Sequence, residues 1–448
     1  MASQLLHRSC ASASTENNLS SLLTLDLSCS TNNFCLAKVT IPASIISALY
    51  HEVSLNQQQH VHTKGFARGN APLEYIQNNF KKNITEHLKE FLFKFCVINF
   101  LYKEIRAHKV IIAGEPRLLD IALEPDKDAL FSFEFTSCND LPIHEWKYLP
   151  FKSPIRKKYQ DLDRQVELFI KTEQALQQEY FSSALNIGDW VNFNISINTA
   201  KKNVELTTLT QNFWFRLGNE KLESPMCDVF LGKKTGDIFD TDNKGFQDFF
   251  SNQLASSYNF HIEIVDTLPY AYFCLNYFKN HFKIKTNKDI HKKLIEVFSY
   301  RDDMSQRRSM VEESFKILLA KHQFTIPQHL ALRQQKAILE KVSLNPDYNV
   351  YRKQKSFLNT IQKLAEKQTR ESIFIDRFAY HENIDLSRED IKGYLNLINR
   401  PRTKEFIYFQ APSSTIHGQE VPVPTEEIKR ICLREKAINH AIYHLTKK

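Results

Sequence analysis

The chain has 448 residues, which is enough for two to four domains, and a hydrophobic content of 42% excludes a chain that is disordered throughout. Only ten residues are glycine, against roughly 30 expected from average composition. No GxGxxG or GxxxxGK(S/T) phosphate loop occurs, so we expect no nucleotide and no other cofactor. The net charge of +8 favours an acidic partner but does not identify it.

Several features indicate a protein of the reducing cytoplasm. The eight cysteines are scattered without a CxxC pair, and residues 1–18 lack the apolar core of a signal peptide, so we predict reduced thiols and a disordered N-terminal tail. The longest apolar run, FLFKFCVINFLY at residues 91–102, contains a charge and is too short to span a bilayer. His60 and His62 have no further ligand at metal-binding spacing, so we expect a polar loop there rather than a metal site.

Residues 19–145 are predicted to form an α+β domain. Alternating apolar residues indicate strands before Pro42 and again at FSFEFT, residues 131–136. Pro42 begins one helical pattern. A second pattern runs from Ile76 to Phe95, with apolar residues spaced so that they share one helical face.

The stretch GFARGNAP, residues 65–72, lies between these two helical patterns. Gly65 and Gly69 permit positive φ angles, and the final proline suits the first turn of the following helix. The residues between the glycines would be held in solvent, where an exposed Phe66 beside Arg68 is suited to docking on a partner. The alternative is an ordinary turn in which Phe66 folds back onto the helices.

Residues 146–448 contain a β module within helical sequence. The pattern from 155 to 183 predicts one long amphipathic helix, unbroken by proline. Five of the ten glycines fall between 185 and 245, where they mark turns, so a β module is predicted at residues 185–267. Residues 268–448 are predicted to be mostly helical, and residues 428–445 show the apolar spacing of a last amphipathic helix.

Two kinds of stretch in the helical part have a functional and a structural interpretation. Apolar stretches at 268–278, 315–319 and 371–380 are candidate surfaces for holding an unfolded chain; alternatively, they are helix cores. The lysine-rich stretches at 152–158 and 279–293 are either solvated helix faces or contacts with RNA phosphates.

The loop GFARGNAP resembles the ribosome-docking loop of the bacterial trigger factor family, which reads GFRKGKxP. The glycines, the phenylalanine and the proline match, and Arg68 keeps one of three basic positions, while Ala67 and Asn70 replace the other two. The resemblance implies a weakened ribosome-docking tip formed by Gly65, Phe66, Ala67, Arg68, Gly69 and Pro72.

The resemblance continues along the chain in the family's order. LNIGDWVNFNISI (185–197) and FRLGNEKLESPMCDVFLGKKTGD (215–237) are similar to segments of the family's FKBP-type peptidyl-prolyl isomerase module. LLDIALEPDKDALFSFEFTSCNDLP (118–142) is similar to the end of its ribosome-binding domain, and FTIPQHLALRQQKAIL (324–339) to a helix of its C-terminal arms. These landmarks extend over roughly residues 20–445.

The family architecture implies a multidomain α+β protein. It has an N-terminal α+β ribosome-binding domain at residues 19–145 and an FKBP-like antiparallel β module at 185–267. The β module is inserted in an all-α C-terminal arm domain, which here would be formed by residues 146–184 and 268–448.

The resemblance also implies an isomerase-like pocket, whose motif is degenerate in this chain. The matching positions are Phe193, Ile195, Trp214, Phe215, Leu222, Glu223 and Met226. Glu223 places a charge where the pocket floor should be apolar, and the family's FPxxY segment is missing. We therefore expect the isomerase fold with weak or no catalysis, and we assign no catalytic residue.

The function that this resemblance implies is that of an ATP-independent cytoplasmic chaperone. It would dock on the large ribosomal subunit at the exit tunnel, contact ribosomal protein and rRNA, and hold nascent and unfolded polypeptides. A membrane partner is not expected, and the sequence leaves open whether the protein forms a homodimer when it is free of the ribosome. Two other functions stay open: an active prolyl isomerase acting on newly made proteins, and a basic RNA-binding protein that keeps only the fold.

Overall fold

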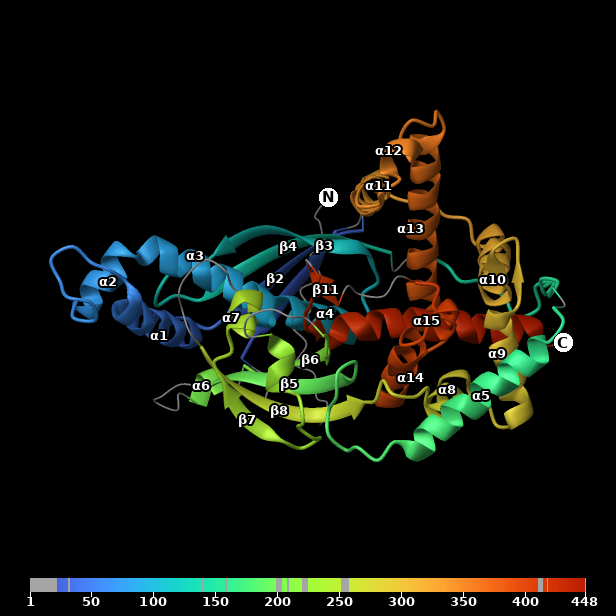
Figure 1. Cartoon of the computed structure of the whole chain (residues 1–448). Coiled ribbons are helices and arrows are strands. Elements are labelled where there is room, and N and C mark those ends of the chain that lie inside the picture. Colours follow the sequence, from blue (N-terminus) through green and yellow to red (C-terminus); the bar gives the residue numbers. More distant parts are fainter. Residues whose placement is uncertain are drawn as a thin grey trace, which may run out of the picture.

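The structure is a computed structural model of the chain. It describes residues 22–30, 33–138, 141–157, 159–198, 204–207, 209–219, 225–250, 258–409, 414–416 and 418–447. Within these residues an antiparallel four-stranded sheet and an antiparallel five-stranded sheet are joined to a body of helices (Figure 1). The mixed α+β class predicted from the sequence is confirmed.

The four-stranded sheet belongs to the N-terminal domain, by which we mean residues 22–138. Its strand order is β1 (Thr24–Cys29), β2 (Phe34–Ile41), β4 (Ala129–Ser137) and β3 (Ile112–Ala122). Apolar residues alternate along β2 and β4, so one face is buried beneath the domain's helices while the other face is more open. The strands predicted before Pro42 and at residues 131–136 are confirmed.

Helices cover the buried face of this sheet. They are α1 (Ala43–His60), α2 (Leu73–Asn79), α3 (Lys81–Leu92), the π-helical turn η1 (Phe93–Val97) and α4 (Ile98–Ala107). Pro42 precedes α1, as predicted. The second pattern is divided at Phe80, which ends α2 and caps α3, but the apolar face from Ile76 to Phe95 is otherwise buried.

A disulfide joins Cys29 to Cys35, which contradicts the prediction that all cysteines are reduced. The two residues are direct cross-strand partners in the β1–β2 hairpin, where opposite Cβ atoms come within disulfide reach. Spacing along the sequence could not show this without the register of the hairpin. The free cysteines in the described part of the chain are Cys96, Cys138, Cys227, Cys274 and Cys432.

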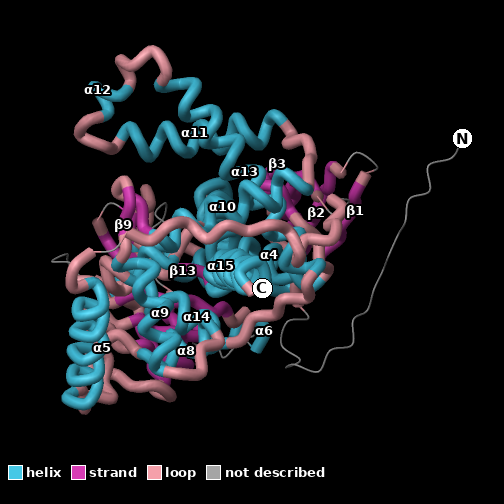
Figure 2. Tube along the Cα trace, turned by 90° about the vertical axis from the view of Figure 1, so that its right-hand side faces the viewer, coloured by secondary structure: helices cyan, strands magenta, loops and turns pink. Residues whose placement is uncertain are grey.

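The described residues 141–157, which precede α5 (Leu162–Glu179), run along the C-terminal helices (Figure 2). The helix predicted for residues 155–183 is too long at both ends, because α5 covers only Leu162–Glu179. Ile155 is exposed and has no apolar surface to pack against, and Asp161 has a φ of 68°, which is incompatible with a continuing right-handed helix. The first buried positions of the pattern are Leu162 and Val166, which is where α5 begins.

Four strands of the five-stranded sheet belong to the β module, by which we mean the described part of residues 185–268. The strand order of the sheet is β13 (Val423–Pro424), β6 (Gln211–Arg216), β5 (Trp190–Asn198), β8 (Asn259–Leu268) and β7 (Ile238–Thr241). Short helices accompany it: α6 (Val204–Thr207), the 3-10 turn η2 (Met226–Val229) and α7 (Lys244–Phe250). The strand β13 comes from the C-terminal part of the chain, so the sheet is completed by residues more than 150 positions beyond β8.

The rest of the chain is mostly helical, as predicted. Its elements are α8 (Leu275–Phe282), α9 (Asn287–Phe298), β9 (Tyr300–Arg301), β10 (Met304–Ser305), α10 (Gln306–Lys321), α11 (Gln328–Ser343), α12 (Tyr348–Tyr351), α13 (Phe357–His381), α14 (Arg388–Ile398), η3 (Thr403–Phe406), β11 (Thr415–Ile416), β12 (Gln419–Glu420) and α15 (Thr425–Thr446). The long helix α15 crosses the middle of the molecule, and α11 to α13 project away from it (Figure 1). We call residues 328–381 the arm hairpin.

Candidate functional site

The loop between α1 and α2, residues 65–72, lies at one end of the molecule (Figure 1). Gly65 and Gly69 have φ angles of 89° and 84°, and a Cβ atom added to either would meet nothing within 4 Å. Each glycine therefore serves backbone conformation rather than close packing. Pro72 directly precedes α2, as predicted from its suitability for a helix start.

Phe66 and Arg68 both lie at the surface of this loop. Phe66 is 39% exposed, and its ring lies 5.2 Å from that of Tyr75 in α2, so it is supported on one side and open on the other. Nε of Arg68 donates a hydrogen bond to the backbone oxygen of Gln59 at 3.2 Å. Ala67 is also exposed, whereas Ala71 is buried and anchors the base of the loop.

The isomerase-like positions are divided between the two faces of the β-module sheet. Phe193, Ile195 and Phe215 are buried on one face, where the ring of Phe193 packs 4.9 Å from that of Phe230. The side chain of Trp214 lies on the opposite face of the sheet, where it packs in a cluster with the C-terminal helices. The structure therefore does not bring the predicted aromatic positions together around one pocket.

Of the remaining isomerase-like positions, the structure describes only Met226. Met226 is 2% exposed at the start of η2. Leu222 and Glu223 lie outside the described residues.

Helix α3 of the N-terminal domain lies against the same face of the β module as Phe193. His87 Nε2 and Tyr258 Oη are 2.8 Å apart, and both side chains are buried. Burial lowers the pKa of His87 to about 4, an effect that the nearby carboxylate of Glu90 opposes. His87 is therefore a neutral hydrogen-bonding group within the folded protein at pH 7.

The three apolar stretches considered as client-binding surfaces are mostly core. Their buried residues include Phe273, Leu275, Phe278, Phe315, Leu318, Phe374, Ile375 and Phe378. The structure thus favours the alternative interpretation, in which these stretches hold the C-terminal helices together.

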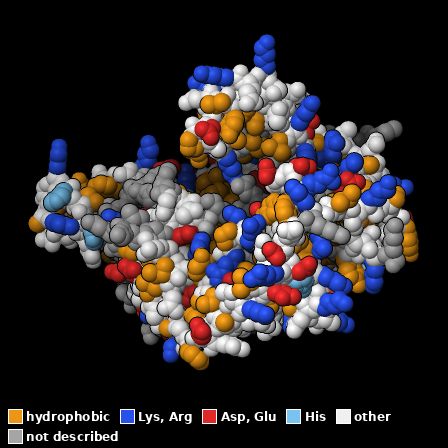
Figure 3. Space-filling view, turned by 45° about the vertical axis from the view of Figure 1, so that its right-hand side comes forward, with side chains coloured by type: hydrophobic (Ala, Val, Ile, Leu, Met, Phe, Trp, Pro, Cys, Tyr) orange, Lys and Arg blue, Asp and Glu red, His pale blue; other side chains and the backbone are white. Residues whose placement is uncertain are grey.

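Exposed apolar side chains are found instead on the arm hairpin. They are Leu332, Leu344, Val350, Tyr351, Leu358 and Leu364. Apolar side chains lie among lysines and arginines on this upper lobe in the space-filling view (Figure 3). The sequence signal was an apolar residue at the end of α11 and others around the short α12, but without the fold they could not be told from core positions.

A polar cleft of about 410 Å³ lies beneath the arm hairpin. The residues that line it on α13 and α15 include Lys367, Glu371, Arg430 and Arg434. The hydroxyl of Tyr408 donates to Glu371 Oε2 at 3.0 Å, and burial raises the pKa of Glu371 to about 7, against the effect of Lys367. The cleft is suited to polar and charged groups rather than to an apolar ligand.

Among the described residues, no group of three or more His, Cys, Asp or Glu side chains is placed to hold a metal ion. The same part of the chain holds no helix that is both long enough and apolar enough to cross a membrane.

Comparisons with known proteins agree with the landmarks in the sequence. Residues 28–169 match the profile of the family described as bacterial trigger factor protein. The trigger factor of Geotalea daltonii is 20% identical over 82% of this chain and 85% of its own length. The trigger factor of Rickettsia prowazekii is 21% identical over 80% of each chain.

A solved structure from work on promiscuous substrate recognition in the folding and assembly activities of the trigger factor chaperone also aligns with this chain. It covers 94% of this chain and all of its own, at 14% identity and a TM-score of 0.35.

Replacing His87 by Gln is expected to reduce the loss of stability on acidification. In the folded protein the imidazole resists protonation, whereas in the unfolded chain it titrates near pH 6.5, so stability falls as the pH drops from 6.5 towards 4. Between pH 7 and pH 5, the protonation of His87 in the unfolded chain lowers the free energy of unfolding by about 2 kcal/mol. The measurement is the free energy of unfolding at both pH values.

Tyr258→Phe is the control for this prediction, because it removes the hydrogen bond but leaves the imidazole buried. It should lower stability at both pH values and keep the pH dependence of the wild type. An identical dependence on pH in His87→Gln and the wild type would contradict the assignment.

Proposed function

We propose that this chain, which belongs to the trigger factor family of chaperones, docks on the large ribosomal subunit at the exit tunnel through residues 65–72. The single observation that carries this proposal is the geometry of that loop. Two glycines with positive φ present Phe66 at the end of the molecule, beside Arg68. A supported aromatic ring next to a cation is a common anchor in protein interfaces.

Docking would be weaker than the family motif implies. Ala67 and Asn70 replace two basic residues, so two contacts with an acidic surface are absent. Exposed charge pairs contribute about 0–1 kcal/mol each, so their loss reduces affinity without abolishing it. Lys64, directly before the loop, is exposed and can supply part of the missing charge.

The arm hairpin is the surface proposed to hold nascent and unfolded polypeptides in the cytoplasm. Its exposed apolar side chains can bury area against many client sequences without specific hydrogen bonds. Lysines and arginines around them keep the free surface soluble (Figure 3). This mode of holding requires no nucleotide.

The β module is proposed to have weak or no isomerase activity. An isomerase pocket must admit a proline peptide to an apolar, aromatic surface. Phe193, Ile195 and Phe215 are at most 1% exposed here, and Trp214 lies on the other face of the sheet. A peptide could reach these side chains only after the surrounding core had opened.

The double substitution Phe66→Ala/Arg68→Ala is expected to weaken co-sedimentation with bacterial 70S ribosomes by on the order of tenfold, since an interface anchor and its cation are both removed. The matched control is Phe34→Ala/Arg117→Ala, which removes an exposed phenylalanine and an exposed arginine from the sheet of the same domain. Equal binding by the wild type and both variants would remove the loop from the interface.

The purified chain is expected to leave the cis–trans isomerisation of a proline peptide close to its uncatalysed rate of tens of seconds. Met226→Ala should not change the result, because Met226 is packed in the core rather than facing a substrate. Strong acceleration by the wild type that is lost in Met226→Ala would show that the module is an active isomerase.

A further inference from the structure

The apolar run at residues 91–102 is not explained by docking or by client binding. In the structure it spans the end of α3, the turn η1 and the start of α4. A helix lying on a sheet needs only one apolar face. Here the consecutive residues Phe95, Cys96 and Val97 are all fully buried, so the segment is covered on more than one side.

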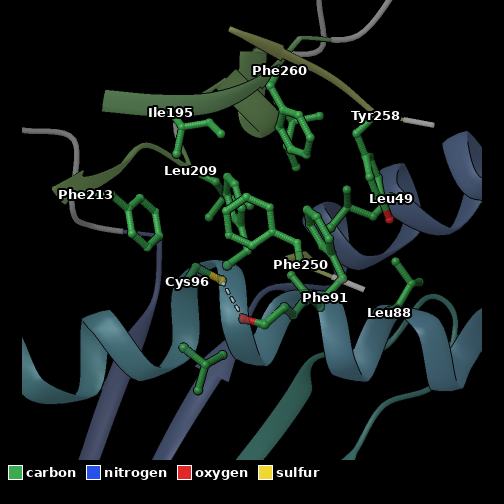
Figure 4. Close-up of a cluster of buried hydrophobic side chains, with 14 of the residues drawn as sticks. Leu49, Leu88, Phe91, Cys96, Ile195, Leu209, Phe213, Phe250, Tyr258 and Phe260 are labelled. Carbon is green, nitrogen blue, oxygen red and sulfur yellow. Dashed lines mark hydrogen bonds between the residues drawn. The ribbon is translucent and has the colours of Figure 1, made fainter. Parts of the chain in front are cut away.

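The two sides of this segment face different parts of the protein. On one side, the ring of Phe93 lies 6.3 Å from that of Phe133 in the N-terminal sheet. On the other side, the ring of Phe91 stacks 4.3 Å from that of Tyr258 in the β module (Figure 4). The segment therefore lies between the two sheets and packs against both.

The contact with the β module is extensive and includes polar groups. The ring of Phe95 lies 5.1 Å from that of Phe250 and 6.5 Å from that of Phe260. Nδ2 of Asn99 donates to Oε1 of Gln211 at 3.0 Å. Together with the pair of His87 and Tyr258, these contacts join the N-terminal domain and the β module in one continuous buried cluster (Figure 4).

The opposite face of the same sheet is held by the C-terminal helices. Trp190 and Trp214 are buried in a cluster with residues of α14 and α15. Nε1 of Trp190 donates to Oδ1 of Asn399 at 2.9 Å. Val423, just before α15, pairs with Trp214 and so adds a strand to the sheet. Both faces of the β module are thus occupied by other parts of the chain.

We propose that the β module is a two-sided clamp that fixes the N-terminal domain to the C-terminal helical body. One face binds the segment from His87 to Asn99, and the other binds α14 and α15, while β13 extends the edge of the sheet beside β6. The partner of the aromatic face is therefore a segment of this chain rather than a proline peptide. Docking loop, β module and helical body then form one rigid unit.

The chemistry of the interface explains why the clamp stays closed. Separating the two parts would expose a contiguous patch of aromatic rings, among them Phe91, Phe95, Phe250 and Phe260, to water. It would also leave His87 and Asn99 without the partners they have across the interface. The inference does not use ribosome docking, so either proposal can fail while the other stands.

A double-mutant cycle on the full chain tests the clamp. The substitutions are Phe91→Leu, Tyr258→Leu and both together, and unfolding by urea is followed by tryptophan fluorescence. The three tryptophans, Trp146, Trp190 and Trp214, all lie outside the N-terminal domain. We expect Phe91→Leu to lower the tryptophan-detected midpoint, and the pair to show a coupling of roughly two- to tenfold in the unfolding equilibrium constant.

Phe133→Leu with Tyr258→Leu is the matched control cycle, because Phe133 is about equally buried but lies in β4 of the N-terminal sheet and packs on Phe93. Its effects should add without coupling. An unchanged midpoint in Phe91→Leu, or additive effects of Phe91→Leu and Tyr258→Leu, would overturn the clamp.

If unfolding is irreversible, hydrogen exchange of the native chain tests the same contact between the N-terminal domain and the β module. Phe91→Leu should speed exchange in β8, across the interface, more than Phe133→Leu does. Equal protection of β8 in these two variants would overturn the proposal.

Discussion

The stacking of Phe91 on Tyr258 is the central contact of the proposed clamp between the N-terminal domain and the β module. It joins a helix of the N-terminal domain to the outer part of the β module, through rings that are fully buried or nearly so. Aromatic pairs of this kind contribute about 0.5–1.5 kcal/mol beyond the burial of their area. Since the pair lies within a larger aromatic cluster, it fixes the orientation of two sheets that are far apart in the sequence.

The proposed clamp would give the proposed docking and client-binding surfaces fixed positions. The docking loop lies at one end of the molecule and the arm hairpin projects from the helical body at another (Figure 1). Salt bridges from Arg106 to Glu426 at 2.7 Å and from Arg430 to Glu115 at 2.9 Å join the N-terminal domain directly to α15. A polypeptide leaving the ribosome would thus meet the apolar side chains of the hairpin at a set distance from the docking loop.

Local features of this fold could be predicted from the sequence, whereas contacts between distant segments could not. Alternation predicted β2 and β4, and the glycines predicted the β module and the exposed loop around Phe66. The strand β13 was missed because two residues carry no periodic signal. The disulfide of Cys29 and Cys35 required a hairpin register, and the early end of the predicted helix at Asp161 required a backbone angle.

The same limit applies to the candidate site. The isomerase-like positions were taken from a motif, but adjacent residues of a strand face opposite ways, so Trp214 and Phe215 belong to different clusters. In the sequence, the apolar run at residues 91–102 indicates only a segment too short to span a membrane. Its second buried face became visible when Phe250 and Tyr258 were placed beside it.

The most direct test of the central claim is site-specific photo-crosslinking in ribosome–nascent chain complexes. A photoreactive amino acid would be placed at Phe66, at Leu344 on the arm hairpin, and, as control, at the exposed Phe181 between α5 and β5. We expect position 66 to crosslink to a protein of the large subunit, position 344 to the nascent chain, and position 181 to neither. Crosslinks from all three positions alike, or none from position 66, would contradict this expectation.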